Sequence, residues 1–187
     1  MENHQPGKIN LIVGCMFAGK TKLLIQRLQS RSPNEYRVVK PTLDGRYGHD
    51  RIVSHDGDWL PAIEVSHTDP EKILSLVQPG VRMVGIDEIQ FFSPGLVPVV
   101  QTLAQNGLRV LLAGLDLDYR GEPFGSVPAL QEMAHQITFT MATCRCGRPA
   151  NRTQRIIQGA EQILVGGKDA YEPRCRQCFE PPPAPSA

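Results

Sequence analysis

The chain has 187 residues, of which 41% are hydrophobic and 21% are charged, a balance typical of a globular protein rather than a disordered or fibrous one. Its 20 Lys and Arg residues nearly equal its 19 Asp and Glu residues, and the net charge of +1 disfavours a protein that neutralises many nucleic-acid phosphates. No stretch approaches the roughly 20 apolar residues that span a bilayer, and the first residues do not resemble a secretory signal. We therefore expect a cytoplasmic protein with neither nucleic acid nor membrane as a partner.

The first 142 residues contain apolar runs of two kinds. Short runs bounded by Gly, Pro or Asp predict buried strands, over residues 8–13, 36–40, 60–65, 81–86 and 109–113. Apolar residues at helical spacing predict helices, over residues 21–29, 95–105 and a segment that opens at Asp69 with Pro70 at its first position. Residues 42–58 are rich in glycine and charge, which predicts a mobile loop. The alternation predicts an α/β domain over residues 1–142, a parallel sheet with helices on both faces.

The character of the chain changes after residue 142. Apolar periodicity fades, and residues 143–180 form a segment too small to fold without a stabilising metal ion or disulfide bond. Residues 181–187 are proline-rich, which predicts a disordered tail. We therefore expect the α/β domain to be followed by a small module and a tail.

Four of the five cysteines lie in this last quarter of the chain and form two pairs. In a reducing compartment, paired thiols indicate a metal site before disulfides. Four thiolates can close a tetrahedron around a structural Zn²⁺ ion, here Cys144, Cys146, Cys175 and Cys178. The second pair has the usual C-x₂-C spacing of zinc ligands, whereas the first, C-x-C, is tighter. A shell in which His135 replaces Cys144, or four unrelated reduced cysteines, remain as alternatives.

The segment from residue 14 to residue 21 matches the phosphate-binding pattern G-x-x-x-x-G-K-[ST]. It consists of Gly14, Cys15, Met16, Phe17, Ala18, Gly19, Lys20 and Thr21. Glycines allow main-chain N–H groups to point at phosphate oxygens, Lys20 adds positive charge for the β- and γ-phosphates, and the Thr21 hydroxyl can ligate Mg²⁺. The predicted strand before the motif and helix after it are the context that it requires. The sequence therefore predicts a nucleoside triphosphate site rather than an incidental glycine-rich turn.

Two acidic residues, Asp87 and Glu88, follow the predicted strand 81–86. The carboxyl ends of parallel strands meet at one edge of a sheet, so both residues are expected to face the phosphate-binding loop. Asp87 can complete the Mg²⁺ shell, and Glu88 can act as a base towards a hydroxyl or a water near the γ-phosphate. The alternative is an acidic pair that caps the next helix. Aromatic residues nearby, such as Phe91 and Phe124, suit a planar acceptor, although they equally fit a core.

These motifs together resemble the type II thymidine kinases, the tetrameric and zinc-containing kind, over residues 7–179. The matching segments are residues 14–21, 85–92, 113–116 with 123–125, and 165–171 before Cys175. The resemblance implies a RecA-like P-loop sheet on which ATP donates its γ-phosphoryl group to the 5′-hydroxyl of thymidine to give dTMP. It makes Glu88 the general base. It assigns the nucleotide to residues 14–21 together with Asp87, Glu88, Ile89 and Gln90, and Mg²⁺ to Thr21 and Asp87.

The resemblance also implies a lasso loop, tethered by the zinc module, that grips the pyrimidine largely through main-chain groups. That loop maps to Gln162, Ile163, Leu164, Val165 and Gly166, with Tyr171 closing on the nucleoside. The walls around the base map to Phe91, Leu115, Tyr119 and Phe124, and the loop near the sugar and phosphates maps to Asp44 and Arg46. Tyr119 stands where a phenylalanine is frequent. Deoxyuridine as a second substrate, thymidine triphosphate as feedback inhibitor and a homotetramer are further implications.

Two other functions share these motifs. A RecA-like ATPase that moves along DNA would have the same phosphate loop and acidic pair, but a net charge near zero disfavours it. A nucleotide-gated switch or a zinc interaction module would not need Lys20 together with Glu88. A thymidine kinase is therefore the preferred interpretation.

Overall fold

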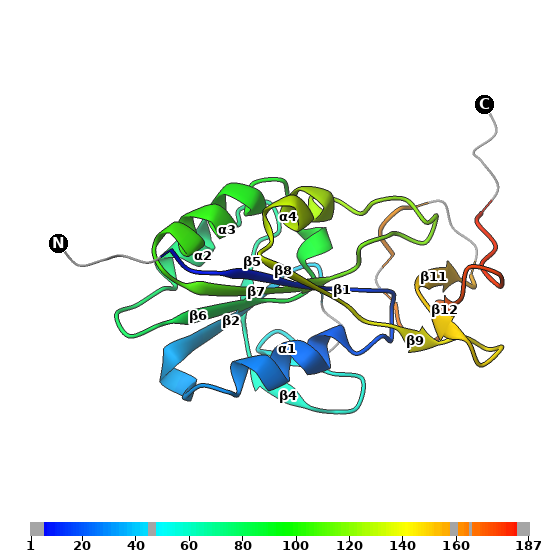
Figure 1. Cartoon of the computed structure of the whole chain (residues 1–187), viewed down its shortest axis with the longest axis horizontal. Coiled ribbons are helices and arrows are strands. Elements are labelled where there is room, and N and C mark those ends of the chain that lie inside the picture. The colour runs from blue at the N-terminus through cyan, green and yellow to red at the C-terminus, as the bar shows by residue number, and fades with distance from the viewer. Residues whose placement is uncertain (1–5, 45–47, 158–160, 165, 183–187) are drawn as a thin grey trace.

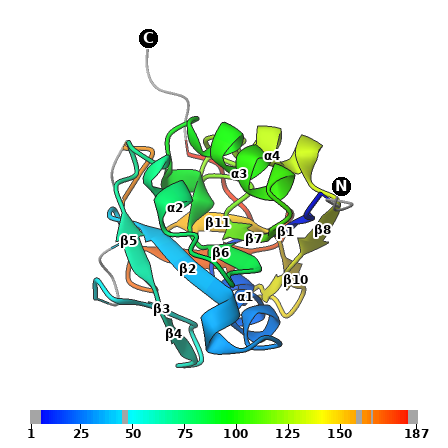
Figure 2. The same cartoon turned by 90° about the vertical axis from the view of Figure 1, so that its left-hand side faces the viewer.

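A six-stranded parallel sheet forms the centre of the computed structural model, which describes residues 6–44, 48–157, 161–164 and 166–182. Its strands lie in the order β5-β2-β6-β7-β1-β8, and every neighbouring pair is parallel. In that order the strands are Ile63–Val65, Tyr36–Pro41, Met83–Ile86, Arg109–Gly114, Ile9–Val13 and Gln136–Phe139. Figure 2 shows β5 and β8 at the two edges of this sheet. The predicted parallel α/β fold is confirmed.

Helices cover both faces of the sheet. Within the described ranges they are α1 (Lys20–Leu28), α2 (Lys72–Ser75), α3 (Leu96–Gln105) and α4 (Val127–Met133), with two short 3₁₀ helices, η1 (Pro33–Glu35) and η2 (Ile89–Phe91). In Figure 1, α2, α3 and α4 lie on one face of the sheet and α1 lies on the other. Among the described residues, no helix has the length and apolar character needed to cross a membrane.

Alternate residues of the central strands face opposite sides of the sheet and so build two cores. In β1, Leu11 packs into the cluster that includes α3, whereas its neighbour Ile12 packs into the cluster that includes α1. On α1, Leu24 and Leu28 are fully buried, because residues four apart lie on one face of a helix. Burial of each such side chain contributes about 1.5–3 kcal/mol. Packing on both faces thus holds in place the edge of the sheet from which the functional loops emerge.

The structure differs from the predicted elements in four places. Residues 60–65, predicted as one strand, belong to two strands in different sheets, because residues 59–61 pair with residues 51–53 whereas β5 pairs with β2. Residues 42–58 are not all loop, because β3 (Arg51–Val53) pairs with β4 (Trp59–Pro61) in a hairpin whose strands are too short to leave a clear pattern. The helix α2 begins at Lys72 rather than at Asp69, since the Asp69 carboxylate pairs with the Lys72 ammonium at 3.1 Å instead of capping the helix. The helix α4 and the strand β8 were not predicted, and β8 is only partly buried, which weakens its apolar pattern.

The described part of the C-terminal module contains two small antiparallel strand pairs. They are β9 (Ala142–Thr143) with β10 (Pro149–Ala150), and β11 (Arg152–Arg155) with β12 (Tyr171–Arg174). The module follows β8 in the chain and lies at the carboxyl end of the parallel sheet (Figure 1). Its predicted boundaries at residues 143 and 180 stay predictions, and residues 183–187 of the predicted tail lie outside the described residues.

Candidate active site

One cavity at the carboxyl edge of the sheet collects residues from several distant parts of the chain. The loop after β1, the acidic pair after β6 and the segment after β7 open into it, and residues of the C-terminal module line its other side. Of the residues predicted for the site, the lining includes Met16, Phe17, Gly19, Lys20, Thr21, Asp44, Asp87, Glu88, Phe91, Leu115, Tyr119, Phe124, Gln162, Ile163, Leu164, Gly166 and Tyr171. The segments predicted to act on a nucleotide and on a nucleoside therefore meet in one place.

The phosphate-binding loop combines left-handed backbone with a buried cation. Gly19 has a φ of 78°, a conformation that favours glycine, and Phe17 has a φ of 64°, which is uncommon for a residue with a side chain. Lys20 Nζ donates to the main-chain carbonyl of Cys15 at 2.7 Å. Burial lowers the pKa of Lys20, and the negative charge of Glu88 opposes that shift. An ammonium group desolvated in this way attracts phosphate oxygens strongly.

Thr21 and Asp87 form the predicted magnesium pair. Thr21 Oγ1 donates to Asp87 Oδ2 at 2.9 Å, and Asp87 Oδ1 accepts from the main-chain N–H of Glu88 at 3.0 Å. Burial, together with the charge of Glu88, raises the pKa of Asp87 to about 7. A hydroxyl and a carboxylate are the oxygen ligands that Mg²⁺ takes, and a cation would offset the cost of burying the carboxylate. The donor set therefore fits the ion.

Glu88 has a left-handed backbone conformation, with φ 50° and ψ 43°. Such a conformation costs a non-glycine residue roughly 1–3 kcal/mol, and strain of this kind clusters at functional sites. The Glu88 carboxylate accepts from Gln90 Nε2 at 2.6 Å. Gln90 is buried, and its Oε1 accepts from the main-chain N–H of Leu115 at 3.0 Å. Glu88 thus lines the cavity with its side chain held by a second, buried side chain.

Aromatic side chains form most of the wall predicted for the nucleoside, and an arginine outside the cavity lining holds two tyrosines in place. Phe91 and Phe124 meet edge to face, with ring centroids 6.0 Å apart. Arg155 stacks over Tyr119, with its Cζ 3.7 Å from the ring centroid. Arg155 Nη2 also donates to the Tyr171 hydroxyl at 2.9 Å. A planar ring can therefore meet flat apolar surfaces on this side of the cavity.

Arg155 also holds the main chain of the predicted lasso loop. Its Nη1 donates to the carbonyl of Glu161 at 2.7 Å, and its Nη2 lies 3.5 Å from the carbonyl of Gln162. Farther along the loop, the Tyr171 hydroxyl donates to the carbonyl of Leu164 at 2.9 Å. The described part of the loop is thus fixed through carbonyl groups and also through one side chain, since Gln162 Nε2 donates to Asp118 Oδ2 at 3.1 Å.

The four cysteines of the C-terminal module converge on one point. The sulfurs of Cys144, Cys146, Cys175 and Cys178 all lie within 4.8 Å of one another. The sulfurs of Cys146 and Cys175 are 3.7 Å apart, and a tetrahedron of Zn–S bonds of about 2.3 Å has edges of about 3.8 Å. Hydrogen bonds from the main chain of Cys146 and Cys175 lower the pKa of Cys144 to about 6, whereas hydrogen bonds with the side chains of Cys146 and Cys175 raise the pKa of Cys178 to about 12. The four thiols are therefore close enough to share protons, and a metal ion would displace them. The set fits a structural zinc ion.

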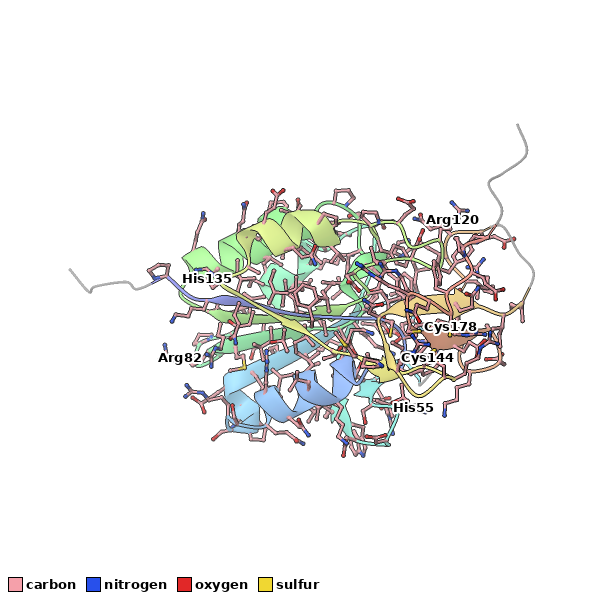
Figure 3. All side chains as sticks on the ribbon, turned by 45° about the vertical axis from the view of Figure 1, so that its right-hand side comes forward. His55, Arg82, Arg120, His135, Cys144 and Cys178 are labelled. Carbon is pink, nitrogen blue, oxygen red and sulfur yellow. The ribbon has the colours of Figure 1, made fainter. Side chains whose placement is uncertain are left out.

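His135 takes no part in this cluster. Its Nδ1 accepts from the main-chain N–H of Ile9 at 3.2 Å, at the start of β1. Figure 3 shows His135 at the opposite end of the molecule from Cys144 and Cys178. The alternative in which His135 replaces Cys144 is therefore wrong, because Cys144 itself joins the other three thiols.

Comparison with known proteins agrees with this geometry. A family model described as thymidine kinase matches residues 7–179. A thymidine kinase of Bdellovibrio bacteriovorus is 45% identical to this chain over an alignment of 181 residues, and the match covers 95% of this chain and 88% of that protein. The chain belongs to the thymidine kinase family. It is thus an enzyme that phosphorylates thymidine, its family implies the use of ATP, and the four converging thiols fit the zinc-containing kind of thymidine kinase.

Some residues that the thymidine kinase resemblance assigns to the nucleotide do not line the cavity. In the part of the chain that the structure describes, these are Gly14, Cys15, Ala18, Ile89 and Gln90. Gln90 lies behind Glu88, and Cys15 offers only its main-chain carbonyl to Lys20. Arg46 and Val165 lie outside the described residues.

The thymidine kinase cavity also contains residues that the sequence did not indicate. They are Lys22, Ile52, Val53, His55 and Thr153. Three of them belong to the β3–β4 hairpin region, where His55 packs edge-on against Phe17 with ring centroids 5.5 Å apart. The apolar pair Ile52 and Val53 inside a polar segment was the one signal for this hairpin. Thr153, a polar residue on the short strand β11, left no signal.

Proposed function

We propose that this thymidine kinase transfers the γ-phosphoryl group of ATP to the 5′-hydroxyl of thymidine, giving dTMP and ADP, with Glu88 as the general base. The observation that carries the proposal is the convergence of Lys20, Thr21 and Glu88 in one cavity whose other wall is aromatic. A phosphate site and a planar-ring site that share a carboxylate suit transfer between a nucleotide and a nucleoside.

The residues around the phosphate loop divide the chemistry among them. Main-chain N–H groups of residues 14–21 and the Lys20 ammonium hold the phosphates and stabilise charge on the transferred group. Thr21 and Asp87 would hold Mg²⁺, which would offset the negative charge of the phosphates. The 5′-oxygen bonds to the γ-phosphorus while the bond to the β–γ bridging oxygen breaks, and ADP leaves with that electron pair. Glu88 takes the proton of the hydroxyl.

We assign recognition of the pyrimidine to main-chain groups of residues 162–166, with Tyr171 beside them. Hydrogen bonds to carbonyls within and directly before this loop, from Tyr171 to Leu164 and from Arg155 to Glu161, support the assignment. Main-chain N–H and C=O groups in fixed positions reject an exocyclic amine placed where a carbonyl is expected. Leu115 and Tyr119 would bound the base, and Asp44 the sugar side. Thymidine should therefore be strongly preferred over deoxycytidine.

Other properties are proposed on the strength of the family resemblance. These are a structural zinc ion that anchors the lasso loop, deoxyuridine as a second substrate, thymidine triphosphate as inhibitor, a homotetramer and a cytoplasmic location. The four converging thiols add support for the zinc ion alone.

A nucleoside screen combined with one variant tests the proposal. Thymidine, deoxyuridine, deoxycytidine and deoxyadenosine are each supplied with ATP and Mg²⁺, and thymidine should be phosphorylated far faster than deoxycytidine or deoxyadenosine. Glu88→Gln should bind ATP and thymidine yet lose about 10²–10⁴-fold in kcat, because an amide cannot accept the proton. A Glu88→Gln variant within threefold of wild type would remove Glu88 from the role of base. ATP hydrolysis that DNA stimulates, with no phosphorylated nucleoside formed, would instead favour the ATPase that moves along DNA.

A further inference from the structure

The peptide group between Cys15 and Met16 is hydrogen-bonded at both ends. Its carbonyl oxygen, on Cys15, accepts from Lys20 Nζ at 2.7 Å. Its N–H, on Met16, donates to Thr153 Oγ1 at 3.0 Å. Because a peptide group is planar, fixing the direction of its N–H also fixes the direction of its carbonyl. The Thr153 hydroxyl therefore sets the position of the oxygen that Lys20 contacts.

Thr153 belongs to the C-terminal module, not to the parallel sheet. It lies on β11, 137 residues from Met16 in the chain, and its side chain is buried. A second bond joins the same two regions, since Cys15 Sγ donates to the main-chain carbonyl of Ala150 at 3.3 Å. Cys15 also packs in one buried cluster with Ala150 and Cys144. The module thus holds the first half of the phosphate loop through two hydrogen bonds and through packing.

We propose that Thr153 is a positioning residue for Lys20, and that the C-terminal module is thereby part of the ATP site as well as of the nucleoside site. The inference rests on the proposed function in one respect, that the phosphate loop binds ATP. Thr153 needs no contact with ATP in this role. Its hydroxyl orients the Cys15–Met16 peptide, and the carbonyl of that peptide holds the Lys20 ammonium inside the loop.

Loss of the hydroxyl would have a specific consequence. The N–H of Met16 would lose its acceptor, and an unsatisfied main-chain donor costs free energy that a rotation of the peptide relieves. Rotation would move the carbonyl away from Lys20. Thr153 also lines the cavity, so the nucleoside affinity of any Thr153 variant can change for reasons of shape alone. Binding of ATP without nucleoside isolates the proposed role.

The experiment is calorimetric titration of the wild-type protein and three variants with a non-hydrolysable ATP analogue and Mg²⁺, in the absence of nucleoside. Thr153→Val keeps the shape but removes the hydroxyl, and its Kd should rise about five- to twentyfold. Thr153→Ser keeps the hydroxyl and should stay within about twofold of wild type. Gln154→Leu is the matched control on the same strand, because the Gln154 amide bonds to the main chain of Glu180, and its Kd should not change.

A double-mutant cycle links the effect to the lysine. In a Lys20→Ala background, Thr153→Val should change the Kd less than twofold, because the group that it positions is gone. A Thr153→Val variant that binds like wild type, equal losses in Thr153→Val and Thr153→Ser, or full additivity with Lys20→Ala would each overturn the inference. If Thr153→Val does not fold, Thr153→Ala, which removes bulk as well, replaces it. Failure of the wild-type protein to bind the analogue would instead contradict the proposed function, and it would contradict this inference as well.

Discussion

Gln90 Nε2 lies 2.6 Å from Glu88 Oε2, and the same buried amide accepts from the main-chain N–H of Leu115 at 3.0 Å. Two glycines make room for it. A Cβ atom at Gly114 would lie 2.5 Å from Gln90 Oε1, and one at Gly125 would lie 2.8 Å from the Gln90 carbonyl oxygen. An amide that must donate on one side and accept on the other has its orientation fixed. Gln90 therefore determines where Glu88 presents its carboxylate.

Removal of this amide should affect turnover more than binding. We expect Gln90→Leu to lower kcat about 10- to 100-fold and to leave the KM for ATP within about threefold, because a misplaced base slows the chemical step. Steady-state kinetics measure both constants, and Gln101→Leu on the exposed side of α3 is the control. An unchanged kcat with a raised KM for thymidine would mean that Gln90 positions Leu115 in the cavity wall and does not position Glu88.

Asp87 should make the stability of the protein depend on pH. Its pKa in the folded protein is raised from 3.8 to about 7, so the ionised form is disfavoured there and the free energy of unfolding falls as pH rises from about 4 to about 7. Asp87→Asn removes this dependence. The free energy of unfolding is measured with urea in buffer without added Mg²⁺, and it should be higher for the variant than for wild type. The difference between the two should grow from pH 4 to pH 7, by on the order of 1 kcal/mol per pH unit at most, and should level off above pH 7.

Asp56→Asn is the control for that measurement. The exposed Asp56 carboxylate is bonded to Lys22, which lowers the pKa of Asp56. The difference in unfolding free energy between Asp56→Asn and wild type should therefore not grow between pH 4 and pH 7. A constant difference between Asp87→Asn and wild type across the range would show that burial of the Asp87 charge is not costly.

Arg155 should matter to the nucleoside and not to ATP. Lysine cannot replace the planar guanidinium that stacks on Tyr119 and bonds the carbonyl of Glu161, so Arg155→Lys should raise the KM for thymidine about tenfold and leave the KM for ATP within about twofold. Arg152→Lys on the same strand is the control, because Arg152 bonds only the carbonyl of its neighbour Asn151 among the contacts described. Equal increases in both KM values would contradict this assignment.

Zinc binding should depend on Cys178 and not on Cys15. Elemental analysis should find about one Zn²⁺ per wild-type chain and almost none in Cys178→Ser, whose thermal unfolding should also begin at a lower temperature. Cys15→Ser is a close control, because Cys15 packs in the same cluster as Cys144 but bonds the Ala150 carbonyl outside the four-sulfur group. A wild-type protein free of zinc after gentle purification would refute the metal assignment.

The sequence predicts the parts of the site that are contiguous in the chain. The phosphate loop is one run of eight residues, the acidic pair directly follows its strand, and the cysteine pairs stand out by spacing. The sequence did not predict the hairpin β3–β4 because Ile52 and Val53 form only a two-residue apolar pair in a polar segment, and Leu60 fits equally well in the longer predicted strand 60–65. Thr153 and Arg155 were missed because their roles depend on contacts with distant segments, and a polar residue on a four-residue strand carries no local signal for such a contact.

The hydrogen bonds of the phosphate loop also constrain when it can form during synthesis. Strand β1 leaves the ribosome before the other strands of the sheet, but it pairs with β7 and β8, and its loop bonds to Ala150 and Thr153, 135 and 137 residues later. Contacts so distant in the chain form slowly, because closing a long loop costs entropy before the contact is gained. A nascent chain that stops short of β11 therefore displays an unpaired apolar strand and an unbonded loop, which are surfaces that chaperones bind and that aggregate. The motif most easily read in the sequence is thus among the last parts of the molecule to acquire its final structure.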